Sequence, residues 1–173
     1  MNKIIYPLVA SLLLLSGCGD TKPANTKNVH KMFQSVSKEK AVLIQSGKEK
    51  QFCIRCGMDL VKFYKTSHAS HSEDGETNYQ YCSIHCLEDH LGDGVALKNP
   101  KVVDVKSLKL ISVADATYVV GSKVRGTMTR VSKYAFLNKE DALVFQKENG
   151  GKIMDFNGAL SKAKEDFEHY NRH

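Results

Sequence analysis

Two short cysteine motifs constrain the fold of this chain more than any other feature of its sequence. Residues 53–58 read Cys-x-x-Cys-Gly-Met, and residues 82–86 read Cys-x-x-x-Cys. Apart from Cys18, these motifs hold all the cysteines of the 173-residue chain. Cysteine pairs at such spacings are typical of metal ligands, and sulfur donors select Cu(I), zinc or iron–sulfur clusters over magnesium or calcium. We therefore predict a fold that brings the two motifs together around one soft metal.

The N-terminus predicts export. Lys3 precedes an apolar run at residues 8–15, which is too short for a membrane-spanning helix of about 20 residues and is typical of a signal segment. The Leu-Ser-Gly-Cys sequence that ends at Cys18 resembles the lipobox of bacterial lipoproteins, which implies cleavage before Cys18 and acylation of its thiol. An ordinary secretory signal is the alternative. The predicted organisation is a signal peptide at 1–17, a flexible tether at 18–36 and a metal-binding domain at 37–173, which makes the protein a membrane-anchored lipoprotein of the periplasm.

In an exported protein, four cysteines also fit two disulfide bonds. Three observations favour a metal instead: the spacing within each motif, Met58 at the end of the first motif and His85 inside the second. A domain spanning residues 37–173 is also large enough to bury a core without cross-links. We therefore place a metal site ahead of structural disulfides.

Apolar patterns and turn residues predict a mixture of short strands and helices. The expected strands are residues 41–45, 51–53, 78–82, 102–105, 118–120, 134–136 and 152–156, with a polar loop at 67–75. The expected helices are residues 84–91 after Ser83 as N-cap, the segment from Asn138 as N-cap to Gly150 with Ala142, Leu143 and Phe145 buried, and residues 158–170.

The order strand–helix–strand occurs twice, at residues 51–105 and 121–157. An Arg-x-x-Met sequence accompanies each copy, at residues 55–58 and 125–128. The sequence therefore predicts an α+β fold made of two similar units in tandem.

Composition and motif context argue against nucleic-acid binding and catalysis. The formal charge of +6 is modest and the lysines are scattered, which fits contact with anionic headgroups or an acidic partner better than with nucleic acid. A redox Cys-x-x-Cys needs to open a helix after a buried strand, and residues 55–58 are not such an opening. A Cys–His nucleophile would need an orienting partner and an oxyanion hole, for which the sequence has no signal. The chain is predicted not to be an enzyme.

The choice of metal lies between Cu(I) and zinc. Four cysteines in two pairs can make a treble-clef-like structural zinc site. Met58 favours Cu(I), because a structural zinc site gains nothing from a thioether and a thioether cannot be lost to disulfide formation. Met128 could complete the Cu(I) shell, whereas His68 and His71 are weak candidates in a polar loop. The candidate metal ligands are Cys53, Cys56, Met58, Cys82, Cys86 and Met128.

Several segments in order resemble the NosL family, copper-binding lipoproteins that help mature nitrous-oxide reductase. They are Cys-Gly-Met at 56–58, Gly-Thr-Met at 126–128, the run at 134–145 and Gly-Gly-Lys-Ile at 150–153. The resemblance implies a tandem ββαβ-type fold, Cu(I) bound through Cys56 and Met58, and nitrous-oxide reductase as the copper-receiving partner.

The chain departs from the NosL pattern in having three further cysteines. Cys56 followed by the pair at 82 and 86 also resembles the TRASH-type heavy-metal motif. Whether the metal is held by a cysteine–methionine shell or by a cysteine cluster, and whether the protein delivers copper or is a zinc-stabilised interaction domain, stays open at this point.

Overall fold

The structure, a computed structural model, describes residues 32–170. The predicted signal peptide at 1–17, the acylated Cys18 and most of the tether lie outside these residues. Residues 32–36, assigned above to the end of the tether, instead pack on the domain: Gln34 is only 3% exposed and its side chain donates to the carbonyl oxygen of Arg125. Within the described part of the chain, no helix is long and apolar enough to cross a membrane.

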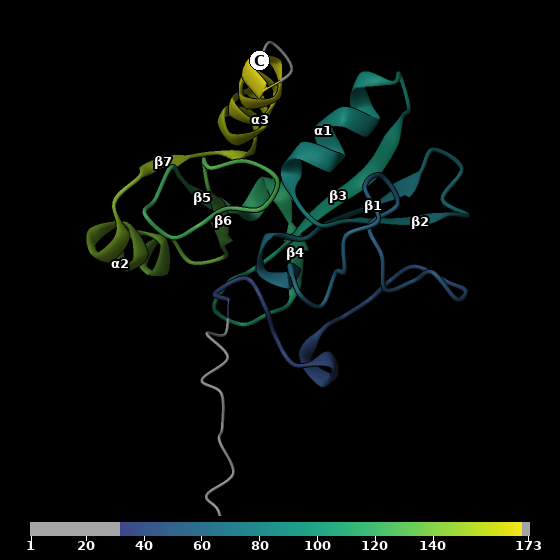
Figure 1. The fold of residues 1–173 in the computed structure, drawn as a ribbon, viewed down its shortest axis with the longest axis horizontal. Coiled ribbons are helices and arrows are strands. Elements are labelled where there is room, and N and C mark those ends of the chain that lie inside the picture. The colour runs from purple at the N-terminus through teal and green to yellow at the C-terminus, as the bar shows by residue number, and fades with distance from the viewer. Residues whose placement is uncertain (1–31, 171–173) are drawn as a thin grey trace, which may run out of the picture. The chain divides into compact units, whose positions relative to one another are not determined.

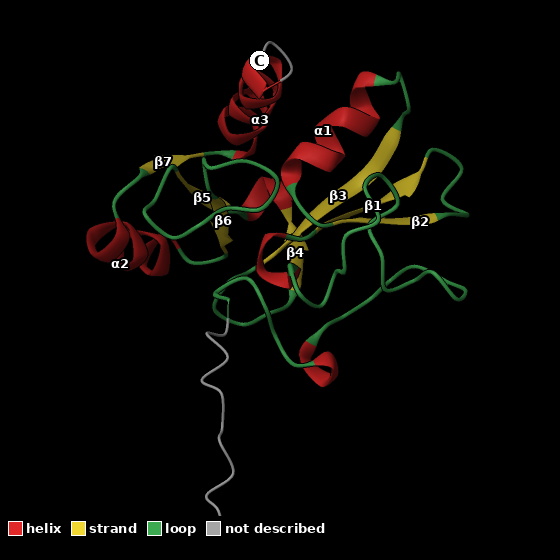
Figure 2. Cartoon of the chain, viewed as in Figure 1, coloured by secondary structure: helices red, strands yellow, loops and turns green. Residues whose placement is uncertain are grey.

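Within residues 32–170, seven strands form two antiparallel sheets (Figures 1 and 2). The first sheet has the order β2-β1-β3-β4, with β1 (His68–Ser72), β2 (Asn78–Tyr81), β3 (Leu97–Val103) and β4 (Leu110–Ser112). The second has the order β6-β5-β7, with β5 (Thr117–Val120), β6 (Lys133–Phe136) and β7 (Lys152–Met154). A parallel bridge between Asp104 and Ala135 joins the two sheets.

In the described part of the chain, three α-helices accompany the sheets: α1 (Ile84–Gly92), α2 (Lys139–Asn149) and α3 (Phe156–Tyr170). The same residues include three single-turn 3-10 helices, η1 (Lys38–Lys40), η2 (Tyr64–Thr66) and η3 (Val113–Asp115). The helices α1 and α3 lie side by side, while α2 lies against the second sheet (Figure 1). The α+β class is confirmed.

The tandem repeat is visible in the topology. The first unit runs β1-β2-α1-β3 with sheet order β2-β1-β3, and the second runs β5-β6-α2-β7 with sheet order β6-β5-β7. The first unit begins at His68, later than the expected residue 51, and the second begins at Thr117, earlier than the expected residue 121. The two Arg-x-x-Met sequences are not equivalent, because residues 55–58 precede β1 whereas residues 125–128 connect β5 to β6.

The strand predicted at 51–53 is absent, and these residues form a turn with a single bridge between Phe52 and Asp59. Two further segments differ from expectation, for a shared physical reason. Residues 41–45 form no strand, because side chains satisfy their backbone: the Val42 amide donates to the Tyr64 hydroxyl and the Ile44 amide to the Gln80 side chain. The polar loop predicted at 67–75 is largely the strand β1. Its polar residues can be buried because they find partners, as His68 does in Tyr118, whose hydroxyl lies 3.0 Å from Nε2.

The ends of the helices agree with the prediction better than the residues predicted to be buried on them. Ser83 and Asn138 occupy the predicted N-cap positions, although neither side chain makes a capping hydrogen bond. Gly150 ends α2 with φ 71°, a left-handed conformation that favours glycine. Within α2, Ala142 and Phe145 are buried as predicted, but Leu143 is 45% exposed.

One core cluster joins both units. It combines Ile84 of α1 and Val102 of β3 with Tyr118 of β5 and two alanines of α3, Ala159 and Ala163. A second cluster surrounds the cysteines and contains Leu60, Tyr81 and Leu87. The small alanines let α3 approach closely, so α3 holds α1 against the second unit.

Acidification is expected to destabilise the domain through His68. Burial lowers the pKa of His68 from 6.5 to about 4. Below pH 6.5 the unfolded chain therefore binds a proton at His68, whereas the folded chain binds it only near pH 4. The contribution of His68 to stability is thus unchanged above pH 6.5, falls between pH 6.5 and pH 4, and is constant below pH 4. One pKa unit corresponds to about 1.4 kcal/mol, so this site should cost roughly 2 kcal/mol at pH 5. Urea unfolding at pH 7 and pH 5 measures the loss. In a His68→Gln variant the difference should shrink, and an undiminished difference would contradict the assignment.

Candidate metal centre

The first cysteine motif is a tight backbone turn. The Cys53 amide donates to the Met58 carbonyl at 2.9 Å, and the Gly57 amide donates to the Cys53 carbonyl at 2.9 Å. Gly57 has φ 71°, which is why glycine suits the position between Cys56 and Met58. The turn aims both cysteine side chains to one side, and the pairing of Phe52 with Asp59 closes its base.

The second motif spans the junction between β2 and α1. Cys82 directly follows β2, and Cys86 lies in the first turn of α1. Both are fully buried, at 0% and 2% exposure. Their sulfur atoms lie 3.8 Å apart, although Cys82 precedes the helix, which begins only at Ile84.

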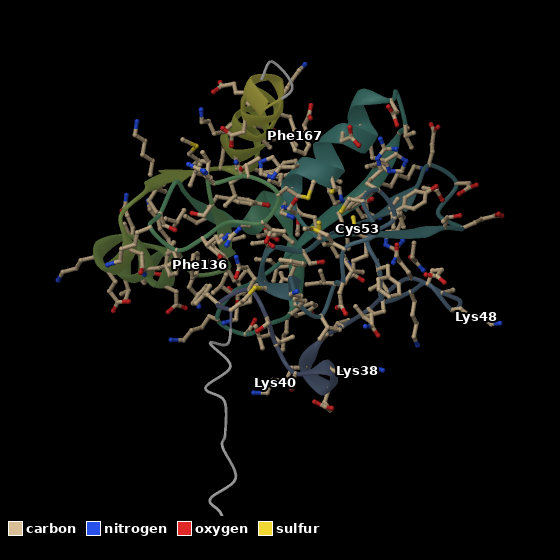
Figure 3. The ribbon with its side chains drawn as sticks, viewed as in Figure 1. Lys38, Lys40, Lys48, Cys53, Phe136 and Phe167 are labelled. Atoms are coloured by element: carbon tan, nitrogen blue, oxygen red, sulfur yellow. The ribbon has the colours of Figure 1, made fainter. Side chains whose placement is uncertain are left out.

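All four sulfur atoms of these cysteines lie within 4.8 Å of one another. The Sγ of Cys56 is 3.4 Å from that of Cys82 and 3.6 Å from that of Cys86. The thioether of Met58 joins the group, with its Sδ 3.7 Å from the Sγ of Cys82. Figure 3 labels Cys53 in this region, close to α1. The tertiary structure thus brings five sulfur donors from two separate motifs into one cluster.

The dimensions of the sulfur cluster fit a single soft metal ion. Four thiolates bound tetrahedrally at about 2.3 Å would lie about 3.8 Å apart. The four cysteines are free thiols at comparable separations. Cys53, Cys56, Cys82 and Cys86 therefore match a tetrahedral ion, and replacing one of them by Met58 gives the softer, mixed set that suits Cu(I).

The shifted pKa values of the four thiols also favour a bound cation. Hydrogen bonds from Cys56, Cys82 and Cys86 lower the pKa of the Cys53 thiol. Contacts with Cys53 and Cys56, together with burial, raise the pKa of Cys82 and of Cys86. The first thiolate is stabilised by its neighbours, whereas further ionisation places like charges side by side in a buried site. A bound metal ion removes that repulsion, so metal binding and proton release are coupled.

The cluster is closed on one side and open on the other. Cys53 is buried, whereas Cys56 is exposed. Met58 is half-buried and lines a groove of about 1100 Å3 that Met32 and Met128 also line. Arg125 and Arg130 border the same groove. Another molecule can therefore approach the cluster at Cys56 and along the thioether side.

Of the predicted ligands, Met128 is the one not shown in contact with the cysteines. It lies in the loop between β5 and β6, is 36% exposed and shares the groove with Met58. His68 is buried and occupied by Tyr118 and the Thr66 carbonyl, and His71 lies in β1. Neither histidine belongs to the cluster.

An ion-pair network fixes the first motif to α1. Arg55 donates through Nε to Asp89 at 2.8 Å and approaches Asp93 at 2.7 Å. Arg55 lies between the first two cysteines, and the aspartates lie in and just after α1, which carries Cys86, so this network connects the two motifs. Sequence spacing gave no sign of it, because the partners are separated by 34 residues.

A second network, missed from the sequence, lies under α1. His85 points away from the cysteines toward the second unit, where its Nε2 lies 3.2 Å from Thr129 Oγ1 and 3.1 Å from Lys133 Nζ. Lys133 also pairs with Asp166 of α3. All three charged or titratable side chains are buried. No sequence pattern marks them, since they come from three elements distant in the chain.

Comparisons with known proteins give a consistent result. The sequence profile of the NosL family matches residues 44–162. Among solved structures, the crystal structure of the copper chaperone NosL from Shewanella denitrificans is similar, with a TM-score of 0.52 and 24% sequence identity over 65% of this chain and 92% of that one. No curated protein sequence matches the chain. The structural similarity supports the fold, and the profile covers both cysteine motifs and the loop that carries Met128.

Proposed function

Because this chain belongs to the NosL family, we propose that it is a Cu(I)-binding metallochaperone that hands copper to an exported copper enzyme. The observation that carries the proposal is the cluster of four thiols with a thioether 3.7 Å from one of them. The partially open donor set suits a metal that is to be passed on rather than used for chemistry on the protein. We therefore propose a carrier and not an enzyme.

The proposed Cu(I) ligands are drawn from the six residues of the sequence prediction. Cys56 and Met58 lie at the accessible side, with Cys82 and Cys86 behind them. Thioether and thiolate sulfur are the donors that Cu(I) prefers. Met128 is proposed as the thioether that covers the ion from the other unit, because it lines the same groove as Met58.

Transfer would proceed by ligand exchange. A donor of the receiving protein approaches the exposed Cys56 side and binds Cu(I), after which the ligands of this chain leave one at a time. The metal is never free in solution, since each ligand is replaced before the next one is lost. The buried Cys53 would be displaced last, because the incoming donor arrives at the exposed Cys56 side and reaches Cys53 after the other ligands.

We further propose the compartment and the partner that the sequence implies. An acylated Cys18 would tether the domain to the periplasmic side of a membrane, and nitrous-oxide reductase would be the receiving enzyme. The family membership supports the partner, and the lipobox-like sequence supports the anchor. Radiolabelled palmitate incorporation that disappears in a Cys18→Ala variant tests the anchor.

Zinc is the second candidate, favoured by the near-tetrahedral spacing of the four cysteines. Zinc would make the cluster a structural site, and the domain would then serve to bind other proteins. A zinc site needs all four cysteines and not Met58, which gives the two candidates opposite mutational signatures.

Metal titration of the reduced protein is expected to show one tightly bound Cu(I). In competition with a Cu(I) chelator, Met58→Ala should lower the affinity about tenfold or more, because a ligand is lost. Met154→Ala serves as the matched control, because Met154 lies in β7 and packs in the other core cluster. Stoichiometric zinc that resists the Cu(I) chelator, with Met58→Ala behaving as wild type, would replace the copper carrier by the zinc domain.

A further inference from the structure

Met128 has a backbone conformation that needs an explanation. Its φ is 73°, in the left-handed region that a non-glycine residue rarely adopts. Such a conformation is unfavourable and persists only where the surroundings impose it. The side chain of Met128 is meanwhile 36% exposed in the groove that Met58 also lines. Its own packing therefore does not account for the conformation.

Hydrogen bonds hold the loop on the N-terminal side of Met128. The buried Gln34 side chain donates to the carbonyl oxygens of Arg125 at 2.6 Å and Gly126 at 3.1 Å, and the Tyr134 hydroxyl also donates to Arg125. Gly126 lies so close to Ser132 that a Cβ there would come within 2.8 Å of the Ser132 Cα. The loop is thus drawn against the second sheet.

Both residues adjacent to Met128 are linked to the second cysteine motif, Thr127 through Thr66 and Thr129 through His85. The hydroxyl of the buried Thr127 lies 2.7 Å from that of Thr66, which in turn donates to the carbonyl oxygen of Cys82 at 2.8 Å. On the other side, the hydroxyl of Thr129 lies 3.2 Å from Nε2 of His85, between the two cysteines of the second motif. Of residues 125–129, Met128 alone makes no polar contact within the described part of the chain, and it lines the groove.

We propose that Thr127 and Thr129, acting through Thr66 and His85, are positioning residues that hold the Met128 thioether over the sulfur cluster in readiness for Cu(I). The proposal rests on the proposed function and deepens it. The Thr127 hydroxyl fixes the β5–β6 loop to the backbone of Cys82 through Thr66, and the Thr129 hydroxyl fixes it to His85 of α1. Met128, held between these two points, adopts its positive φ as a result. A thioether already in place need not be ordered when the metal arrives, which strengthens binding.

Thr127→Val removes the hydroxyl and keeps the shape. We expect Cu(I) affinity, measured by chelator competition, to fall about tenfold, as for losses of groups that orient a metal ligand. Thr127→Ser should restore it. Thr117→Val is the matched control, because Thr117 is half-buried in β5 and no hydrogen bond of its hydroxyl is seen in the described part of the chain. A Thr127→Val affinity within twofold of wild type would overturn the proposal.

A double-mutant cycle separates positioning from general destabilisation. Met128→Ala should lower Cu(I) affinity in the wild-type protein and should have almost no further effect in the Thr127→Val protein, since the thioether there is already out of place. An equal effect of Met128→Ala in both proteins would show that the hydroxyl does not act through Met128, and would overturn the proposal.

A measurement without copper keeps this proposal separate from the proposed function. In the metal-free protein with 13C-methyl methionine, Thr127→Val should move the Met128 methyl resonance toward its position in an unfolded chain and leave the Met154 resonance in place. An unmoved Met128 resonance would reject the positioning role even if Cu(I) binds. A wild-type protein that binds no Cu(I), with the Met128 resonance shifting as described, would reject the carrier function and keep the role of Thr127 in placing Met128.

Discussion

Cys82→Ser is expected to abolish tight Cu(I) binding, with a loss of affinity greater than about 100-fold, because even the removal of groups that only orient ligands costs about 10- to 100-fold. Cys82 has the most sulfur neighbours: its Sγ lies 3.4 Å from Cys56, 3.8 Å from Cys86 and 3.7 Å from Met58. Serine is close in size but offers a hard oxygen donor that Cu(I) disfavours. Chelator competition on the reduced protein gives the number.

The neighbouring Ser83 supplies the control for this prediction. Its hydroxyl is buried and has no hydrogen-bond partner among residues 32–170, so Ser83→Ala makes a one-atom change in the same turn without removing a ligand. Cu(I) affinity and stability should both stay near the wild-type values. If Cys82→Ser bound Cu(I) as tightly as Ser83→Ala, the ion would have to lie away from the sulfur cluster.

Lys133→Met is expected to cost about 3–5 kcal/mol of unfolding free energy, because it leaves the carboxylate of Asp166 buried without its main partner. The two side chains are 2% and 8% exposed, and the pair joins β6 to α3. Loss of this contact should loosen α3 from α1 and from the second sheet. Equilibrium unfolding in urea measures the change, which should be accompanied by no change in the slope with denaturant.

Two further variants identify the cause. Lys162→Met removes a cation whose side chain is 36% exposed and 3.6 Å from the other oxygen of Asp166, and it should cost less than about 1 kcal/mol. Lys133→Met combined with Asp166→Leu should recover most of the stability, since no unpaired charge then remains buried. If the double variant were as unstable as Lys133→Met alone, lost packing rather than an unpaired charge would explain the effect.

The α+β class and the repeated strand–helix–strand order could be predicted from the sequence, because periodicity and glycine punctuation are local. The strands at 78–82, 118–120 and 134–136 and all three helices were found near their places. The strand predicted at 51–53 was wrong, and the strand β4 was not predicted. The strand predicted at 41–45 and the loop predicted at 67–75 were also wrong. In both, side chains distant in sequence decided the result: Tyr64 and Gln80 satisfy the first backbone, and Tyr118 allows His68 to be buried in the second.

The sequence by itself determined the composition of the sulfur cluster, because each cysteine pair, and Met58 after the first pair, has a short spacing that a turn or the start of a helix can bring together. Only the tertiary structure decided which residues hold that cluster in place. Arg55 reaches Asp89, Thr66 joins Cys82 to Thr127, and His85 reaches Thr129. These partners lie 16 to 61 residues apart, so no local pattern predicts them. They meet because the two units pack through a shared core, which places the loop of the second unit beside the motifs of the first.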